Sequence, residues 1–218
     1  MTEQAPAPAG PAPRRTGRPP LTERRRAETR REIAAEAVRL FAAQGVAATS
    51  ADEIAAAAGV STRTLWRYFR TKEECVRPLL TTGLDAMAAR VRTWDGTGSL
   101  FEAVRREGEL EMEPRHAEAL HQLVRLTERE PGLRAVWLET HAEAESLFAG
   151  IVAEATGRSP HELDLRVHVA VFNLAMRIAV EDWARGGDPS AEASLDALTR
   201  TIAATLRAVV RTFAEPAN

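Results

Sequence analysis

The chain has 218 residues, of which 44% are apolar, 28% charged and 5% aromatic, and its net charge is −2. This length and composition fit a globular protein of one large or two small domains. The longest run without a charged residue, 40–51, has twelve residues, whereas a membrane-spanning helix needs about 20, so we expect no membrane segment. Pro and Arg stand where a signal peptide would need an apolar stretch, which predicts a cytoplasmic protein.

The small net charge conceals an asymmetry between the two ends of the chain. Residues 1–78 carry fourteen Lys and Arg against nine Asp and Glu, a balance of +5. Residues 79–218 carry fifteen against twenty-two, a balance of −7. The pattern suggests a polyanion-binding module attached to an acidic body, with a chance distribution as the alternative.

The N-terminal part is predicted to be a solvated tail followed by short helices. Six of the twelve prolines lie within residues 1–20, where they oppose helix formation. Capping boxes at Ser50 and Thr71 and the glycines Gly45 and Gly59 mark helix ends. The expected helices cover about 22–44, 50–58, 61–69 and 71–94. Pro78 falls about two turns into the last of them and is predicted to kink it or to mark a domain junction.

The remainder also lacks the alternating pattern of strands, so the fold class is predicted to be all-α. A helix begins at Ser99, and others are expected over 115–130, 132–156, 160–185 and 189–214. The 160–185 helix is apolar around nearly its whole circumference and must be buried on more than one side. The 189–214 helix has apolar residues at a 3–4 residue spacing. Together these two helices predict a homodimer interface, with a buried helix in a monomer as the alternative.

Residues 49–72 contain the most informative sequence motif in the chain. Two short helices meeting at Gly59, with small or apolar residues at the crossing, are typical of a helix-turn-helix that presents its second helix to the major groove of DNA. On that second helix Leu65 and Phe69 face inward. One outward stripe holds Thr62, Arg63, Trp66 and Arg67. An exposed Trp there indicates a partner that covers it; the alternative is that Trp66 folds back onto the next helix.

Residues 28–74 resemble the N-terminal DNA-binding domain of TetR-family transcriptional regulators. The resemblance includes Ile33, Phe41 and Gly45 of the first helix, the turn at 49–61 and the run 64–73. The chain departs from the family where Trp66-Arg67 replaces paired aromatics and where Arg63 replaces Gly or Pro. These departures alter the base-contacting stripe, so the operator sequence cannot be transferred from relatives.

The pattern and the resemblance assign roles to individual side chains. Arg63 and Arg67 can each donate two hydrogen bonds to a guanine, and Thr62 and Trp66 are placed to contact base edges or a thymine methyl group. The other expected DNA contacts, chiefly with phosphates, are Thr49, Ser50, Ser61, Thr64, Tyr68 and Lys72. Lys72 is the only lysine in the chain.

The tail resembles the arginine hooks that enter the minor groove of DNA, through Arg14, Arg15 and Arg18. A nonspecific tether and a solvated extension are the alternatives. The predicted domains are a Pro/Arg-rich tail (1–20), a helix-turn-helix DNA-binding domain (21–77) and a helical effector-binding and dimerisation domain (78–218).

For the third domain the resemblance implies a ligand cavity. Stretches 130–157 and 160–185 look like family members associated with acyl-CoA-like ligands. The candidate cavity residues are Met87, Trp94, Phe101, Leu120, Val124, Trp137, Phe172, Asn173, Met176 and Arg177. Such a set suits a mainly apolar effector with a polar or anionic head, with Asn173 and Arg177 as the polar contacts. The alternative is that these residues are ordinary core.

Other chemistry is poorly supported by the sequence. It has no phosphate loop, dinucleotide motif or nucleophile elbow, and its histidine spacings complete no metal site, so we expect no enzyme, no cofactor and no metal. Cys75 is either a redox switch or a buried inert thiol. The predicted function is a homodimeric repressor that a small effector releases from a palindromic operator. The alternative is a constitutive or architectural DNA-binding protein.

Overall fold

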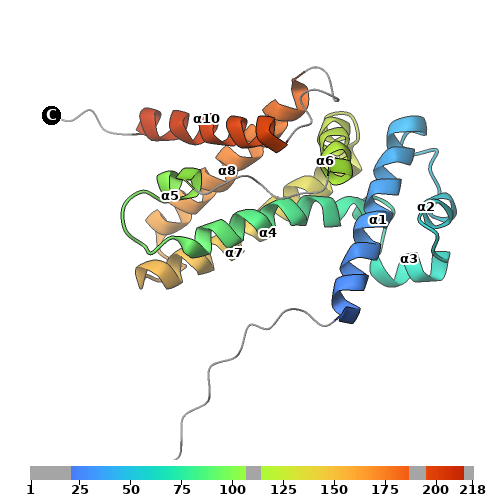
Figure 1. The fold of residues 1–218 in the computed structure, drawn as a ribbon, viewed down its shortest axis with the longest axis horizontal. Helices are drawn as coiled ribbons and strands as arrows, with labels where there is room; N and C mark the ends of the chain where they lie inside the picture. Colours follow the sequence, from blue (N-terminus) through green and yellow to red (C-terminus); the bar gives the residue numbers. More distant parts are fainter. Residues whose placement is uncertain (1–20, 107–113, 187–194, 214–218) are drawn as a thin grey trace, which may run out of the picture.

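The computed structural model describes residues 21–106, 114–186 and 195–213, and every regular element in these ranges is helical. Figure 1 shows the N-terminal helices packed at one end of a longer helical body. The all-α prediction is confirmed. The elements are α1 (Leu21–Gln44), α2 (Ala51–Ala57), α3 (Thr62–Tyr68), the 3-10 turn η1 (Glu73–Val76), α4 (Arg77–Thr93), α5 (Leu100–Arg106), α6 (Pro114–Thr127), α7 (Pro131–Thr156), α8 (Leu163–Arg185) and α10 (Leu195–Phe213).

The fourth expected helix differs from the prediction. The single helix with a kink at Pro78 is replaced by the 3-10 turn η1 and then by α4, in which Pro78 is the second residue. A proline is tolerated in the first turn of a helix, because no residue there needs to donate an intrahelical hydrogen bond. Pro78 therefore begins α4 and does not bend it.

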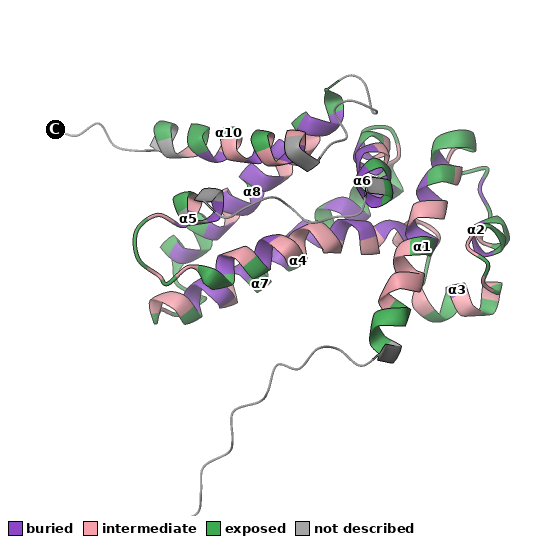
Figure 2. Cartoon of the chain, in the orientation of Figure 1, coloured by how far each residue is buried: buried purple, intermediate pink, exposed green. Residues whose placement is uncertain are grey.

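The N-terminal helices surround a small core of their own. One face of α1 buries Ile33, Ala37 and Phe41, and α2 and α3 add Ile54 and Leu65 to the same cluster. Helices α1, α2, α3 and η1 pack against one another, and α1 also packs on α6 of the larger body. Figure 2 shows buried residues continuing from α1 into α6 and α4, so the two parts share one apolar core.

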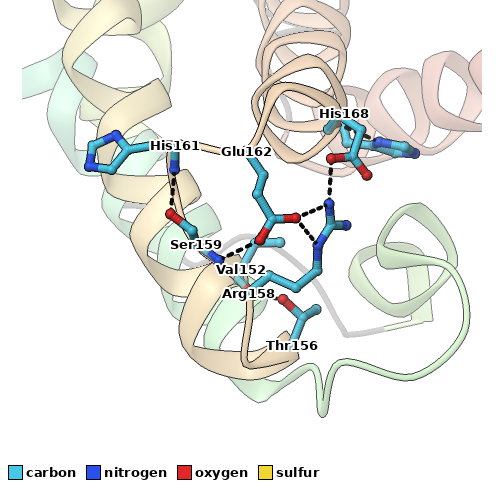
Figure 3. Close-up of polar contacts among 8 residues, drawn as sticks. Val152, Thr156, Arg158, Ser159, His161, Glu162 and His168 are labelled. Atoms are coloured by element: carbon cyan, nitrogen blue, oxygen red, sulfur yellow. Dashed lines mark hydrogen bonds and ion pairs between the residues drawn. The ribbon is translucent and has the colours of Figure 1, made fainter.

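In the larger body α7 packs against α4 and α8, and α8 packs against α10. Gly157 adopts a left-handed conformation with a φ of 67° and ends α7. After it, the Arg158 guanidinium donates to Glu162, at 2.7 Å and 2.9 Å, and also pairs with Asp164. The Ser159 backbone donates to the other Glu162 oxygen at 2.8 Å (Figure 3). These contacts fix the turn from which α8 begins.

Helix α8 is only partly enclosed, although its sequence is apolar nearly all round. Val169, Phe172 and Met176 are buried within the chain. The exposed large apolar side chains of α8 are Leu163, Val167, Leu174 and Ile178. The apolar face of α10, which includes Leu198, Ile202 and Leu206, is buried within the same chain. Among the side chains of these two helices that the structure describes, the exposed large apolar ones are on α8.

Two further observations bear on the expectations from sequence. No helix within the described ranges is long and apolar enough to cross a membrane. The expected tail, residues 1–20, and the start of the expected 189–214 helix lie outside the described residues.

Candidate nucleic-acid interface and internal cavity

The turn before α2 is built as the sequence predicts. The Ser50 hydroxyl accepts a hydrogen bond from the Glu53 backbone at 3.2 Å, and the Glu53 carboxylate accepts one from the Ser50 backbone at 2.7 Å. This capping box also lowers the pKa of Glu53, chiefly through the hydrogen bond from the Ser50 backbone. Gly59, with a φ of +65°, lies in the left-handed region just after the helix.

Three hydroxyl groups fix the start of α3. Ser61 caps the helix and accepts a hydrogen bond from the Thr64 backbone at 3.1 Å. The Ser61 and Thr64 hydroxyls are 2.9 Å apart, and the Thr62 hydroxyl donates to Asp52 of α2 at 2.5 Å. The Thr62–Asp52 bond joins α3 to α2, while the two Ser61 contacts stabilise the first turn of α3. The predicted DNA contacts of Ser50, Ser61, Thr62 and Thr64 would add to these internal roles.

The outward stripe of α3 is exposed as predicted. Leu65 is fully buried, whereas Arg63, Trp66 and Arg67 are exposed, and Trp66 keeps 46% of its surface accessible. Trp66 therefore does not fold back onto the next helix. The Arg67 guanidinium carbon lies 5.2 Å from the ring centroid of Tyr68, a cation–π contact that orients it at the helix surface.

Lys72 and Thr49 have structural contacts that sequence reasoning missed. The Lys72 ammonium donates to the backbone carbonyls of Val46 and Thr49, at 2.6 Å and 2.9 Å. The Thr49 hydroxyl donates to the Gly45 carbonyl at 2.7 Å, and the residue is only 1% exposed. Thr49 thus stabilises the turn between α1 and α2. Because its hydroxyl is buried and already donates a hydrogen bond, it does not fit the expected DNA contact. Lys72 has a third ammonium proton, so its predicted phosphate contact stays a prediction.

Arginines of α1 lie beside the end of α3. Arg30 and Arg31 line a groove together with Tyr68 and Phe69, and the acidic residues Glu74 and Asp85 line the same groove. Sequence reasoning placed no site residue on α1, although the run Arg24-Arg25-Arg26 was a visible signal. The tail residues Arg14, Arg15 and Arg18, which precede α1, lie outside the described residues.

A small, partly open cavity of about 50 Å³ lies among α4, α6, α7, α8 and α10. Four of the ten predicted ligand residues line it: Met87, Leu120, Trp137 and Met176. Its other lining residues are Leu80, Gly83, Leu84, His141, Val180 and Ile202. Drug-sized ligands occupy about 300–1,000 Å³, so this conformation is nearly closed.

The other predicted ligand residues lie elsewhere. The Trp94 indole donates to the Thr97 carbonyl at 2.7 Å, in the loop after α4. Phe101 packs edge-on against Phe172, with ring centroids 5.9 Å apart. Val124 is buried outside the cavity lining, and Arg177 pairs with Glu181 at 3.3 Å. These four, with Phe172, act as core or surface residues in this conformation.

Asn173 instead organises a buried polar group around His141. Its amide nitrogen donates to the His141 carbonyl at 2.9 Å and to the Glu145 carboxylate at 3.1 Å, and its amide oxygen lies 2.8 Å from His141 Nδ1. Burial is the main cause that lowers the pKa of His141. Sequence reasoning considered the histidines only as possible metal ligands. In the described part of the chain, no three His, Cys, Asp or Glu residues form a group able to hold a metal ion.

Cys75 belongs to η1 and is fully buried. Burial, followed by the charges of Glu73 and Glu74, raises the pKa of its thiol to about 12. Since the thiolate is the reactive form, the structure favours an inert thiol over a redox switch.

Comparison with known proteins agrees with both parts of this architecture. Residues 33–79 match the family model of bacterial regulatory proteins of the tetR family, and residues 98–207 match the MftR C-terminal domain. The HTH-type transcriptional regulator TcmR of Streptomyces glaucescens is 33% identical over 187 residues, which cover 80% of this chain and 81% of TcmR.

MftR of Mycobacterium tuberculosis is 28% identical over 191 residues, covering 84% of this chain and 93% of that protein. A solved TetR-family regulator from Rhodococcus sp. shares the fold, with a TM-score of 0.50, 23% identity and coverage of 84% of this chain and 98% of that one. The two family models and the likeness to TcmR show that the chain belongs to the TetR family of transcriptional regulators.

Proposed function

We propose that the protein is a homodimeric repressor that binds a palindromic operator in the cytoplasm and is released by a small, largely apolar effector. The observation that carries this proposal is the exposed stripe Arg63, Trp66 and Arg67 on α3, which follows a hydrogen-bonded turn. Residues 21–77 form the DNA-reading domain in this account, and residues 78–218 form the sensor.

The side chains of the stripe fit the chemistry of the major groove. Arg63 and Arg67 can each donate two parallel hydrogen bonds to O6 and N7 of a guanine, which is worth about 1–3 kcal/mol of discrimination. Trp66 supplies an apolar surface for a thymine methyl group. Ser50, Ser61, Thr64, Tyr68 and Lys72 are proposed to contact phosphates, which set the register of the protein on the duplex. Arg14, Arg15 and Arg18 are proposed to reach the adjacent minor groove.

The proposed dimer interface is built on α8, with α10 beside it. Leu163 and Val167 are 73% and 52% exposed, and Leu174 and Ile178 continue their stripe along the same side of the helix. An apolar stripe of this length is typical of a surface that another protein covers. A second copy related by a two-fold axis would bury it and would present two α3 helices to successive major grooves.

A path for effector control runs through the helices around the cavity. Helix α6, which contributes Leu120 to the cavity, packs directly on α1, and α7 packs on η1. Arg77 at the start of α4 binds Glu139 and Glu143 of α7, the latter at 2.8 Å. An effector that enlarges the cavity would therefore move α4 and α6 against the DNA-reading domain. It releases DNA only if it binds the non-binding arrangement more tightly.

The acyl-CoA-like effector stays a prediction that rests on family resemblance. A constitutive or architectural DNA-binding protein without an effector is the second candidate. The two are separated by a compound that both stabilises the purified protein against heat and lowers its affinity for DNA. If compounds bind the cavity but none of them changes the affinity for DNA, the protein is a constitutive DNA-binding protein.

The DNA-reading role is tested by titrating the protein against DNA that flanks its own coding region and against random DNA. Arg63→Ala is expected to weaken binding to the flanking DNA about tenfold or more, and to weaken binding to random DNA much less. Arg92→Ala is the matched control, because Arg92 is an exposed arginine near the far end of α4. Equal losses on both DNAs for Arg63→Ala would contradict the base-reading role.

A further inference from the structure

The cavity has an almost entirely apolar wall with one polar exception. Leu80, Leu84 and Met87 come from α4, and the other helices add chiefly Leu, Ile, Met, Val and the Trp137 ring. The Trp137 indole nitrogen is turned toward Glu181, to which it donates at 3.2 Å. Among the described residues that line the cavity, His141 brings an imidazole atom without a hydrogen-bond partner.

The hydrogen bonds of Asn173 determine which nitrogen of His141 carries the proton. The Asn173 amide nitrogen faces two acceptors, the His141 carbonyl and the Glu145 carboxylate, so the amide oxygen faces Nδ1 of His141 at 2.8 Å. An amide oxygen only accepts hydrogen bonds, so Nδ1 is the N–H donor. Burial lowers the pKa of His141 and keeps the ring neutral, and a neutral imidazole has a single N–H.

Nε2 of His141 is therefore a bare acceptor. The residue is 4% exposed, and Nε2 is a buried atom with no hydrogen bond within the described chain. The ring is fixed in place by Asn173 and by the Trp137 ring, which meets it edge-on with centroids 4.3 Å apart. A buried acceptor without a donor is destabilising, and a ligand that supplies the donor removes that penalty.

We propose that the cavity binds a largely apolar molecule carrying a hydroxyl or N–H group, and that Nε2 of His141 accepts a hydrogen bond from that group. This inference rests on the proposed effector function and names the chemistry of the effector. A carboxylate or phosphate offers only acceptor atoms, so an anionic head does not fit against Nε2. The anionic part of an acyl-CoA would have to lie outside the cavity.

The walls leave room for the cavity to widen. Met87 and Met176 are flexible side chains, and a Cβ atom added at Gly83 would have no neighbour within 4 Å. Gly83 lies in the middle of α4, where glycine is less favourable than alanine. Gly83 lines the cavity, so the larger side chain in Gly83→Leu is expected to hinder ligand binding.

The first test is the tautomer of His141 in the free, full-length protein. Nitrogen NMR of the histidine rings, assigned by comparison with His141→Asn, is expected to show a protonated Nδ1 and an unprotonated Nε2. Addition of phenol, a small apolar donor, is expected to shift the Nε2 resonance. A protonated Nε2, or an Nε2 signal that saturating phenol leaves unmoved, overturns the proposal.

The second test compares phenol with toluene, which replaces the hydroxyl by a methyl group of similar size. By calorimetry the wild-type protein is expected to prefer phenol about tenfold. His141→Asn keeps a donor near the Nδ1 position for Asn173 and removes the Nε2 acceptor, so it is expected to abolish that preference. His141→Gln, whose amide oxygen can reach the Nε2 position, is expected to restore part of it. Equal affinities in the wild-type protein overturn the proposal.

A DNA-release assay separates this inference from the proposed function. If phenol-like donors bind through His141 without weakening DNA binding, the cavity chemistry stands and the effector-controlled repressor fails. If DNA is released equally well by ligands without a donor, in the wild-type protein and in His141→Asn, the repressor stands and the role of His141 fails.

Discussion

Lys72 offers a test of how the DNA-reading domain is held together. Its ammonium donates to the carbonyls of Val46 and Thr49, which joins the segment after α3 to the turn between α1 and α2. A hydrogen bond to a charged group contributes about 1.5–3 kcal/mol when well buried. Lys72 is half-buried, so water can replace part of each bond. Lys72→Met, which keeps the aliphatic stem, is expected to lower the free energy of unfolding by about 2–4 kcal/mol.

Salt distinguishes this role from phosphate binding. The two acceptors are neutral carbonyls, so the decrease in stability measured by urea unfolding should be similar at low and high salt. If the Lys72 ammonium also binds a phosphate, Lys72→Met would reduce the slope of log affinity against log salt by about 0.9. Arg70→Met is the matched control, because Arg70 is an exposed cation two residues earlier. An unfolding free energy of Lys72→Met within about 0.5 kcal/mol of wild type would refute the reasoning.

Three further predictions concern other parts of the chain. The Cys75 thiol, with its pKa raised to about 12, is expected to resist Ellman's reagent in the native protein at pH 8 and to react once urea unfolds it; rapid native reaction would contradict its burial. Gly96→Ala is expected to lower the free energy of unfolding, measured by thermal unfolding, by about 2 kcal/mol or more, because φ is +84° and the new Cβ would lie 2.3 Å from the Ala155 carbonyl oxygen. Gly98→Ala is the control: its φ is also positive but its new Cβ has no close neighbour, so the decrease should be smaller. Burial lowers the pKa of His141 in the folded state, so the histidine of the unfolded chain gains its proton first as pH falls below about 6.5. The free energy of unfolding should therefore decrease below this pH, and it should decrease less steeply in His141→Asn. Identical pH profiles of stability for the two proteins would refute this prediction.

Local patterns made the helix-turn-helix predictable from sequence. The caps and turns of this region depend on contacts between residues within four positions of one another, so their spacing alone indicates them. The residues concerned are Ser50, Glu53, Gly59 and Ser61. The outward stripe of α3 follows from helical periodicity in the same way, because Leu65 identifies the opposite, buried face.

Features that depend on tertiary contacts were not predictable. Lys72 binds a carbonyl 26 residues away, and His141 meets Asn173 across a gap of 32 residues. The predicted kink at Pro78 was wrong, because the capping signal at Thr71 precedes a 3-10 turn that no local pattern distinguishes from an α-helical turn. The alternative, that Pro78 marks a domain junction, stays a prediction. The cavity lining was only partly identified, since an apolar residue on a buried helix looks the same whether it borders a cavity or a packed core.

The central claim, that paired α3 helices read DNA, is tested most directly by hydroxyl-radical footprinting on DNA that flanks the coding region. At about 0.15 M salt, where nonspecific contacts are weak, the account predicts two protected patches related by two-fold symmetry and centred about one helical turn, or a multiple of it, apart. Arg63→Ala should erase both patches, while Arg92→Ala should preserve them. Protection that is uniform along the fragment, or that survives in Arg63→Ala, would contradict the account.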